Sequence, residues 1–106
     1  MVINKSNISY EELKKELETG KTVIKFYADW CGPCKMLGPV YEAVSEEMEG
    51  ITFLEVNIDD NREVTNEFGV KNIPSIFLVK DGEVTKSNSG FLAKPKLVEF
   101  IGQLND

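Results

Sequence analysis

The stretch TVIKFYADWCGPCK, residues 22–35, carries the pattern from which the fold can be predicted. Its first half is mostly β-branched, aromatic or otherwise apolar, which is typical of a strand buried in the middle of a sheet. Cys31 and Cys34 follow, and Pro33 between them suits the first turn of a helix. Helically spaced apolar residues continue over 36–48. The stretch therefore predicts a buried strand that leads directly into a helix, with a cysteine pair at the junction.

The rest of the chain alternates between strand and helix patterns. Ser9 and Glu12 form a capping box before a helix that Gly20 ends, and Asp81-Gly82 is a strong hairpin signal. The other predicted elements are an edge strand at 2–3, strands over 51–58, 75–80 and 83–89, a short helix over 64–68 and a last helix from Pro95. This order predicts an α/β fold with parallel early strands, an antiparallel hairpin at the sheet edge and helices on both faces. We expect residues 1–106 to form a single domain.

The composition excludes several classes of protein. The 106 residues include two cysteines and no histidine. Without histidine, the chain cannot build a Ser-His-Asp or Cys-His catalytic set, or a zinc site of mixed cysteine and histidine ligands. Two cysteines alone cannot complete an all-cysteine zinc site or hold an iron–sulfur cluster. We therefore expect no metal.

Charge and hydropathy restrict partners and location. A net charge of −6 and a pI near 4.7 argue against nucleic-acid binding and against adsorption to an anionic membrane. The longest apolar runs are too short to cross a bilayer, and no signal peptide is visible at the start of the sequence. The expected location is the cytoplasm. Because thiols there are mostly reduced, the two cysteines are expected to be reactive rather than structural.

The spacing of the cysteines suggests redox chemistry. Positions i and i+3 of a helix share a face and are close enough for a disulfide after small adjustment. Cys31 is expected at the helix N-terminus, where free N–H groups and the helix dipole stabilise a thiolate and lower its pKa. Cys34, one turn in and more buried, can then resolve a mixed disulfide. A structural disulfide across so short a loop would stabilise little, and a shared metal site would need a second chain.

These residues belong to a wider pattern that runs along the chain. The pattern comprises WCGPCK at 30–35 together with Phe26, Ala28, Pro39, Asn57-Ile58-Asp59, Phe68-Gly69-Val70, Ile73-Pro74, Asp81-Gly82 and Gly90. With it, the chain resembles the thioredoxin family over essentially its whole length. The resemblance implies the thioredoxin fold, a central mixed sheet of four to five strands flanked by four helices.

The resemblance also implies an activity, that of a protein-disulfide reductase that works by dithiol–disulfide exchange. Cys31 would be the attacking thiolate and Cys34 the resolving thiol, while Gly32 and Pro33 would set the redox potential. The implied partners are disulfide-containing protein substrates and a thioredoxin reductase that recharges a monomer. No bound cofactor is expected, because the dithiol itself carries the electrons. Gly32-Pro33 argues against an oxidase or isomerase of the same fold, whereas a binding module with an idle dithiol stays open.

A docking groove around the disulfide is implied as well. Trp30 would flank the disulfide, and Pro74, in cis, would bring the backbone of Ile73 beside it to pair with an extended substrate strand. Gly90 would line the same groove, since a side chain there would crowd the substrate. Phe91 is bulkier than the small apolar residue usual in the family. It either belongs to this rim or packs in the core against the last helix.

Lys25 and Glu55 depart from the family pattern. The family usually carries a buried aspartate at the position of Lys25 and commonly a lysine at that of Glu55, so the charges are exchanged. Each interrupts an apolar strand, which is costly unless it finds a partner; the two either pair or point to solvent. If Lys25 is buried near Cys34, a cation would favour the Cys34 thiolate, whereas a neutral amine would take its proton. We therefore count both residues as candidates for redox tuning.

Overall fold

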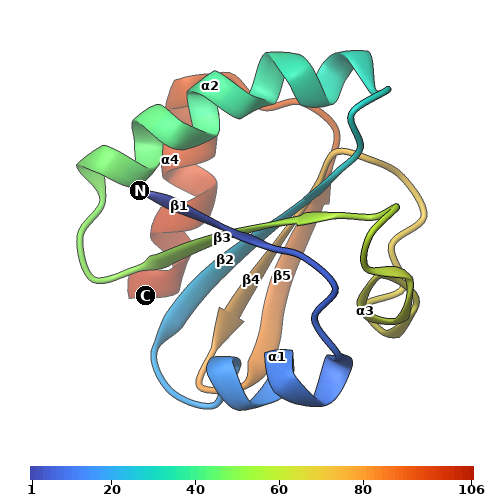
Figure 1. Cartoon of the computed structure of the whole chain (residues 1–106). Helices are drawn as coiled ribbons and strands as arrows, with labels where there is room; N and C mark the ends of the chain where they lie inside the picture. The colour runs from blue at the N-terminus through green and yellow to red at the C-terminus, as the bar shows by residue number, and fades with distance from the viewer.

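A five-stranded sheet lies between two layers of helices in the computed structural model, which describes residues 1–106 (Figure 1). The strands are β1 (Val2–Lys5), β2 (Lys21–Tyr27), β3 (Thr52–Asn57), β4 (Ser75–Lys80) and β5 (Glu83–Ser89). The helices are α1 (Tyr10–Leu17), α2 (Gly32–Glu47), α3 (Arg62–Glu67) and α4 (Lys94–Gly102), followed by a 3-10 turn, Gln103–Asn105. The predicted mixed sheet with helices on both faces is confirmed.

The strands lie in the order β1-β3-β2-β4-β5. β1, β3 and β2 are parallel, as the alternation of strands and helices predicted. β4 is already antiparallel to β2, with Ser75 opposite Phe26. The reason is that α3 is short and lies at the end of the sheet where β3 stops, so the chain re-enters the sheet from the end at which it left (Figure 1). The loop before β4 is thereby brought to the same end as the start of α2.

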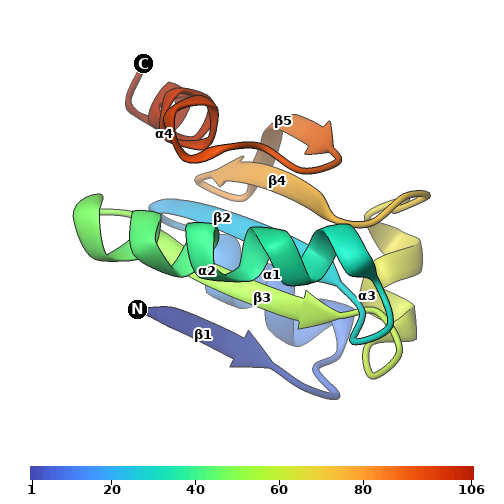
Figure 2. The ribbon, with the colours of Figure 1, turned by 90° about the horizontal axis from the view of Figure 1, so that it is seen from above.

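Alternate residues of the central strands divide the core into two layers. Figure 2 shows α2 and α1 on opposite faces of the sheet. Val23 of β2 packs in the α2 and α4 layer, and its neighbour Ile24 packs in the α1 and α3 layer, as expected for a strand buried on both faces. By the same alternation, Lys25 points to the α2 side. The first layer contains Leu37, Tyr41, Val44, Phe53, Ile76, Leu78, Leu97, Ile101 and Leu104, and the second Leu13, Leu17, Phe26, Leu54, Val56, Val64 and Val79.

Two local signals are reproduced in detail. Ser9 caps α1 by accepting from the Glu12 N–H, and the Glu12 carboxylate accepts from the Ser9 N–H, which completes the predicted capping box. Asp81 and Gly82 turn between β4 and β5 with φ values of 48° and 85°. Both angles lie in the left-handed region that a two-residue hairpin turn of type I′ requires. The edge strand predicted at 2–3 extends to Lys5 and pairs with β3.

Candidate active site

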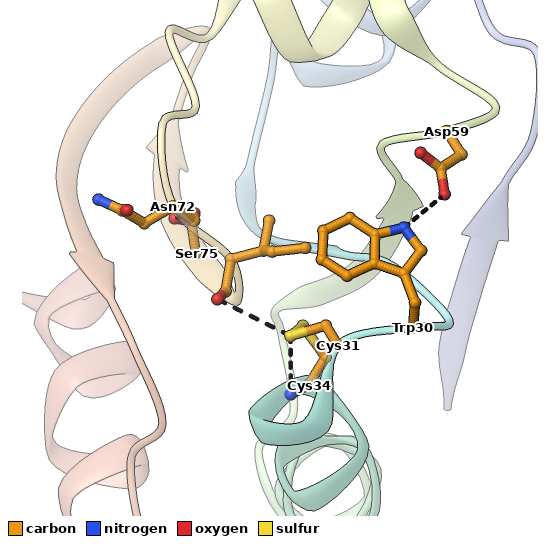
Figure 3. Close-up of a disulfide and its surroundings, with 7 residues drawn as sticks. Trp30, Cys31, Cys34, Asp59, Asn72 and Ser75 are labelled. Atoms are coloured by element: carbon orange, nitrogen blue, oxygen red, sulfur yellow. Dashed lines mark hydrogen bonds between the residues drawn. A yellow bond between two sulfur atoms is a disulfide. The ribbon is translucent and has the colours of Figure 1, made fainter.

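Cys31 and Cys34 lie where β2 ends and α2 begins, and they form a disulfide with 5.2 Å between their Cα atoms. Cys31 is the N-cap of α2, and its sulfur accepts a hydrogen bond from the Cys34 N–H at 3.2 Å (Figure 3). The two cysteines are buried to nearly the same extent, at 6% and 4% exposure. Cys34 is the more buried of the two, as expected, although the difference is small. Ala28 and Ile73, which pack in the same cluster, cover Cys31 as well.

The start of α2 favours negative charge on sulfur. Its first turn contains no acidic residue, so no side chain there neutralises the partial positive charge of the helix N-terminus. Gly32 and Pro33 occupy that first turn, and both residues are exposed. Pro33 lacks an N–H, which costs nothing in this turn because the first N–H groups of a helix have no partner within it.

Trp30 is 68% exposed, although it is the only tryptophan and directly precedes Cys31. Its indole Nε1–H donates to Asp59 Oδ2 at 3.0 Å, from the loop that follows β3 (Figure 3). No local pattern in the sequence links Asp59 to Trp30, because the two residues lie 29 positions apart in the chain. This hydrogen bond holds a large apolar ring in solvent beside the disulfide.

The loop before β4 approaches the disulfide from the other side. The carbonyl oxygen of Ile73 lies 3.8 Å from Cys31 Sγ, and the Ile73–Pro74 peptide bond is cis. The Ser75 hydroxyl donates to the Asn72 carbonyl and so closes the turn that contains Ile73. The loop thus presents the backbone carbonyl of Ile73 to the disulfide, and the Ile73 side chain packs against the same cysteine cluster.

Gly90 joins this loop, since its N–H donates to the Pro74 carbonyl at 2.8 Å. Its φ of +99° is one that residues with a Cβ rarely adopt, and an added Cβ would meet no protein atom within 4 Å. Glycine is therefore required here by the backbone conformation and not by a lack of space for a side chain. Phe91, the next residue, is 40% exposed and belongs to neither core layer, so the alternative of core packing against the last helix is wrong.

Lys25 and Glu55 are directly opposite each other on β2 and β3, with 3.6 Å between Nζ and Oε1. The alternative that both point to solvent is wrong for Lys25, which is only 4% exposed. The Glu55 side chain is partly exposed, and its Oε2 accepts from the Asn4 side-chain amide at 2.8 Å. The Lys25 ammonium also lies 5.1 Å from the centre of the Tyr27 ring and 5.0 Å from that of Tyr41.

Burial dominates the proton affinities in this cluster. It lowers the pKa of Lys25, and the charge and hydrogen bond of Glu55 oppose that effect. Burial also raises the pKa of Tyr27, and it raises that of Tyr41 well above its usual value. In the sequence, Tyr41 is only one of the helically spaced apolar residues of 36–48. Its position over Lys25 depends on how α2 lies across the sheet, which no local pattern reports.

No group of three or more His, Cys, Asp or Glu side chains is arranged to hold a metal ion. No helix is long and apolar enough to cross a membrane.

Comparison with known proteins gives a consistent result. The family model described as Thioredoxin matches residues 2–103. A thioredoxin of Mycoplasmoides gallisepticum is 38% identical over 91 residues, covering 85% of this chain and 91% of the relative. A thioredoxin of Bacillus subtilis is 35% identical over 94 residues, covering 88% and 90%. The crystal structure of a Malassezia sympodialis thioredoxin superimposes with a TM-score of 0.87 at 31% identity, covering 99% of this chain and 94% of that one.

Proposed function

Because the chain belongs to the thioredoxin family and is a protein-disulfide oxidoreductase that works by dithiol–disulfide exchange, we propose that Cys31 attacks substrate disulfides and Cys34 resolves the intermediate. The observation that carries this assignment is the position of Cys31 at the N-cap of α2, where the Cys34 N–H points at its sulfur. A thiolate on Cys31 would gain that hydrogen bond and the favourable end of the helix dipole. Cys34, inside the first turn, has no such cap.

The proposed cycle conserves atoms and electrons. The Cys31 thiolate forms a bond to one substrate sulfur as the substrate disulfide breaks, and the departing sulfur takes a proton from solvent. Cys34 then loses its proton and attacks Cys31 Sγ. The Cys31–Cys34 bond forms, the mixed disulfide breaks, and the second substrate sulfur leaves as a thiolate. Two electrons have passed to the substrate, and the disulfide of the structure corresponds to the oxidised end of the cycle.

We place the substrate against the backbone of Ile73, in an extended conformation. Support comes from the Ile73 carbonyl at 3.8 Å from Cys31 Sγ, which would face a substrate strand lying across the disulfide. Pro74, which has no N–H, and Gly90, which has no side chain, leave that approach open. Trp30 and Phe91, both substantially exposed, would supply apolar contact on either side.

The partners and location follow from the same proposal. A thioredoxin reductase would return electrons to the Cys31–Cys34 disulfide, and no bound cofactor would be needed, because the dithiol carries the electrons. Gly32 and Pro33, between the cysteines, would set the redox potential. We propose a monomer that consists of one domain over residues 1–106, acts in the cytoplasm, and binds neither nucleic acid nor membranes, in keeping with its net charge of −6.

Reduction of insulin by dithiothreitol tests the assignment. The native protein should accelerate the reaction, and Cys31→Ser should abolish the acceleration. Cys34→Ser should instead retain protein substrates as mixed disulfides on Cys31, and Cys31→Ser, as the matched control, should retain none. Full activity in Cys31→Ser would contradict the proposed order of attack. If the native protein does not accelerate the reaction and the Cys34→Ser variant traps no substrate, the protein is a binding module with an idle dithiol.

A further inference from the structure

A polar hollow of about 590 Å³ lies beside Cys34, away from the proposed docking face. Lys25 and Glu55 line it together with Cys34, so the buried ion pair and the second cysteine share one solvent-connected space. The exchange cycle described above gives no task to this lysine. A buried cation that shares a hollow with a reacting sulfur needs an explanation, because a lysine on a central strand is costly to bury.

The charged residues around the hollow differ in how strongly solvent screens them. Asp29, Glu42 and Lys35 also line it, but all three are exposed, so water and salt screen their fields. Lys25 is 4% exposed, and its field is screened much less. The net formal charge of the lining residues therefore says little about the electrostatic field inside the hollow. Lys25 and its partner Glu55 are the least exposed of these charges, and Cys34 lines the same hollow.

The contacts of Lys25 are those of an ammonium rather than a neutral amine. Glu55 Oε1 lies 3.6 Å from Nζ, and the faces of Tyr27 and Tyr41 lie about 5 Å from it. A carboxylate and two aromatic faces each attract a cation and give a neutral amine little. These contacts oppose the effect of burial, which by itself favours the neutral form.

We propose that the Lys25 cation stabilises the Cys34 thiolate during resolution of the mixed disulfide, and that Glu55 attenuates this effect. The inference rests on the proposed roles of Cys31 and Cys34 and deepens them. Cys34 releases its proton to water in the hollow. The resulting thiolate attacks Cys31 Sγ, the Cys31–Cys34 bond forms, and the bond from Cys31 to the substrate breaks. Lys25 keeps its proton throughout and acts only through its charge.

A chromogenic aromatic disulfide, dithiobis(nitrobenzoate), separates the two steps in a stopped-flow experiment on the reduced protein. Attack by Cys31 releases one coloured thiolate, and resolution by Cys34 releases a second. The first phase tests the proposed function, and the second tests this inference. If the first phase survives in Cys34→Ser and is lost in Cys31→Ser, the order of attack stands whatever the second phase shows.

Lys25→Met preserves the length of the side chain and removes its charge. We expect the pH profile of the second phase to move up by about one unit. Because a more basic thiolate is also the better nucleophile, the rate at neutral pH should fall only about threefold. Glu55→Gln removes the opposing charge and should have the opposite effect, a downward shift and a faster second phase. Lys86→Met, on exposed β5, is the matched control for net charge and should leave both phases unchanged.

The opposite effects expected for Lys25→Met and Glu55→Gln on the second phase distinguish an electrostatic role of this ion pair from a merely structural one. Damage to the fold around the hollow would slow the second phase in both variants. A lysine that accepted the Cys34 proton would be lost outright in Lys25→Met, so the second phase would slow without an upward shift of its pH profile. An unchanged profile in Lys25→Met, or a slower second phase in Glu55→Gln, would overturn the proposal. If Lys25→Met does not fold, the proposal is tested by Glu55→Gln alone: a faster second phase supports it, and a slower one overturns it.

Discussion

Tyr41→Phe removes one hydroxyl from the centre of the protein and leaves the ring in place. Tyr41 is completely buried in α2, and its hydroxyl lies 2.7 Å from the Leu54 carbonyl oxygen and 3.1 Å from that of Val23. These carbonyls belong to β3 and β2, so the hydroxyl ties α2 to the middle of the sheet. The ring keeps its edge contact with Phe53 and its position over Lys25 in the variant.

The expected loss is that of one buried hydrogen bond. It should lower the free energy of unfolding at neutral pH by about 1 kcal/mol. In a protein of this size, that corresponds to a melting temperature lower by about 4–8 °C. Urea unfolding of the oxidised protein, followed by circular dichroism, measures the difference. Tyr10→Phe, at the partly exposed start of α1, is the matched control and should change the free energy by less than about 0.5 kcal/mol.

The pH dependence supplies a second, independent test of Tyr41. Burial raises its pKa well above the usual value of 10.0, so the folded protein keeps the phenolic proton to higher pH than the unfolded chain does. Between pH 10.0 and the folded pKa, the folded state binds more protons, and stability therefore falls as pH rises. Tyr41→Phe lacks this contribution, so its deficit relative to the native protein should shrink above pH 10.0. Equal stabilities of the two proteins at neutral pH, together with parallel curves at alkaline pH, would mean that the Tyr41 hydroxyl does not stabilise the fold.

Three further substitutions test single features. Ser9→Ala removes the cap of α1 and should lower the free energy of unfolding by about 1 kcal/mol with disulfide exchange unchanged, as urea titration and insulin reduction would show. Gly90→Ala should cost about 1–3 kcal/mol in thermal unfolding because of its φ of +99°; a neutral result would mean that the backbone relaxes there. Trp30→Ala should leave stability within about 0.5 kcal/mol, because the side chain is exposed, yet raise KM for insulin; an unchanged KM would exclude it from docking.

Much of the fold could be predicted because its signals are local. The capping box at Ser9 and Glu12 and the turn at Asp81-Gly82 depend on residues a few positions apart, and both formed as expected. The cysteine pair at the junction of a strand and a helix is equally local. The ends of the elements are harder to predict. The strand predicted at 51–58 is Thr52–Asn57, because hydrogen bonds to neighbouring strands decide where a strand ends.

Features that join distant segments could not be predicted in the same way. The sequence suggested that Lys25 and Glu55 either pair or face solvent, and the parallel register of β2 and β3 decides for pairing. The hydrogen bond from Trp30 to Asp59 and the exposure of Phe91 depend on how loops meet at one end of the sheet. Hydrophobic periodicity reports which face of an element is buried, but not which residue lies opposite.

Local patterns are enough to predict the order of strands and helices and the position of the redox pair, because the torsion angles of short segments follow from the side chains within them. The surroundings of that pair depend on long-range packing. The Ile73 carbonyl beside Cys31, the direction of β4, and a buried lysine that shares a hollow with Cys34 all arise from packing between segments far apart in the chain. The electrostatic field at a reacting sulfur is set by distance and burial, and these quantities exist only once the chain has folded.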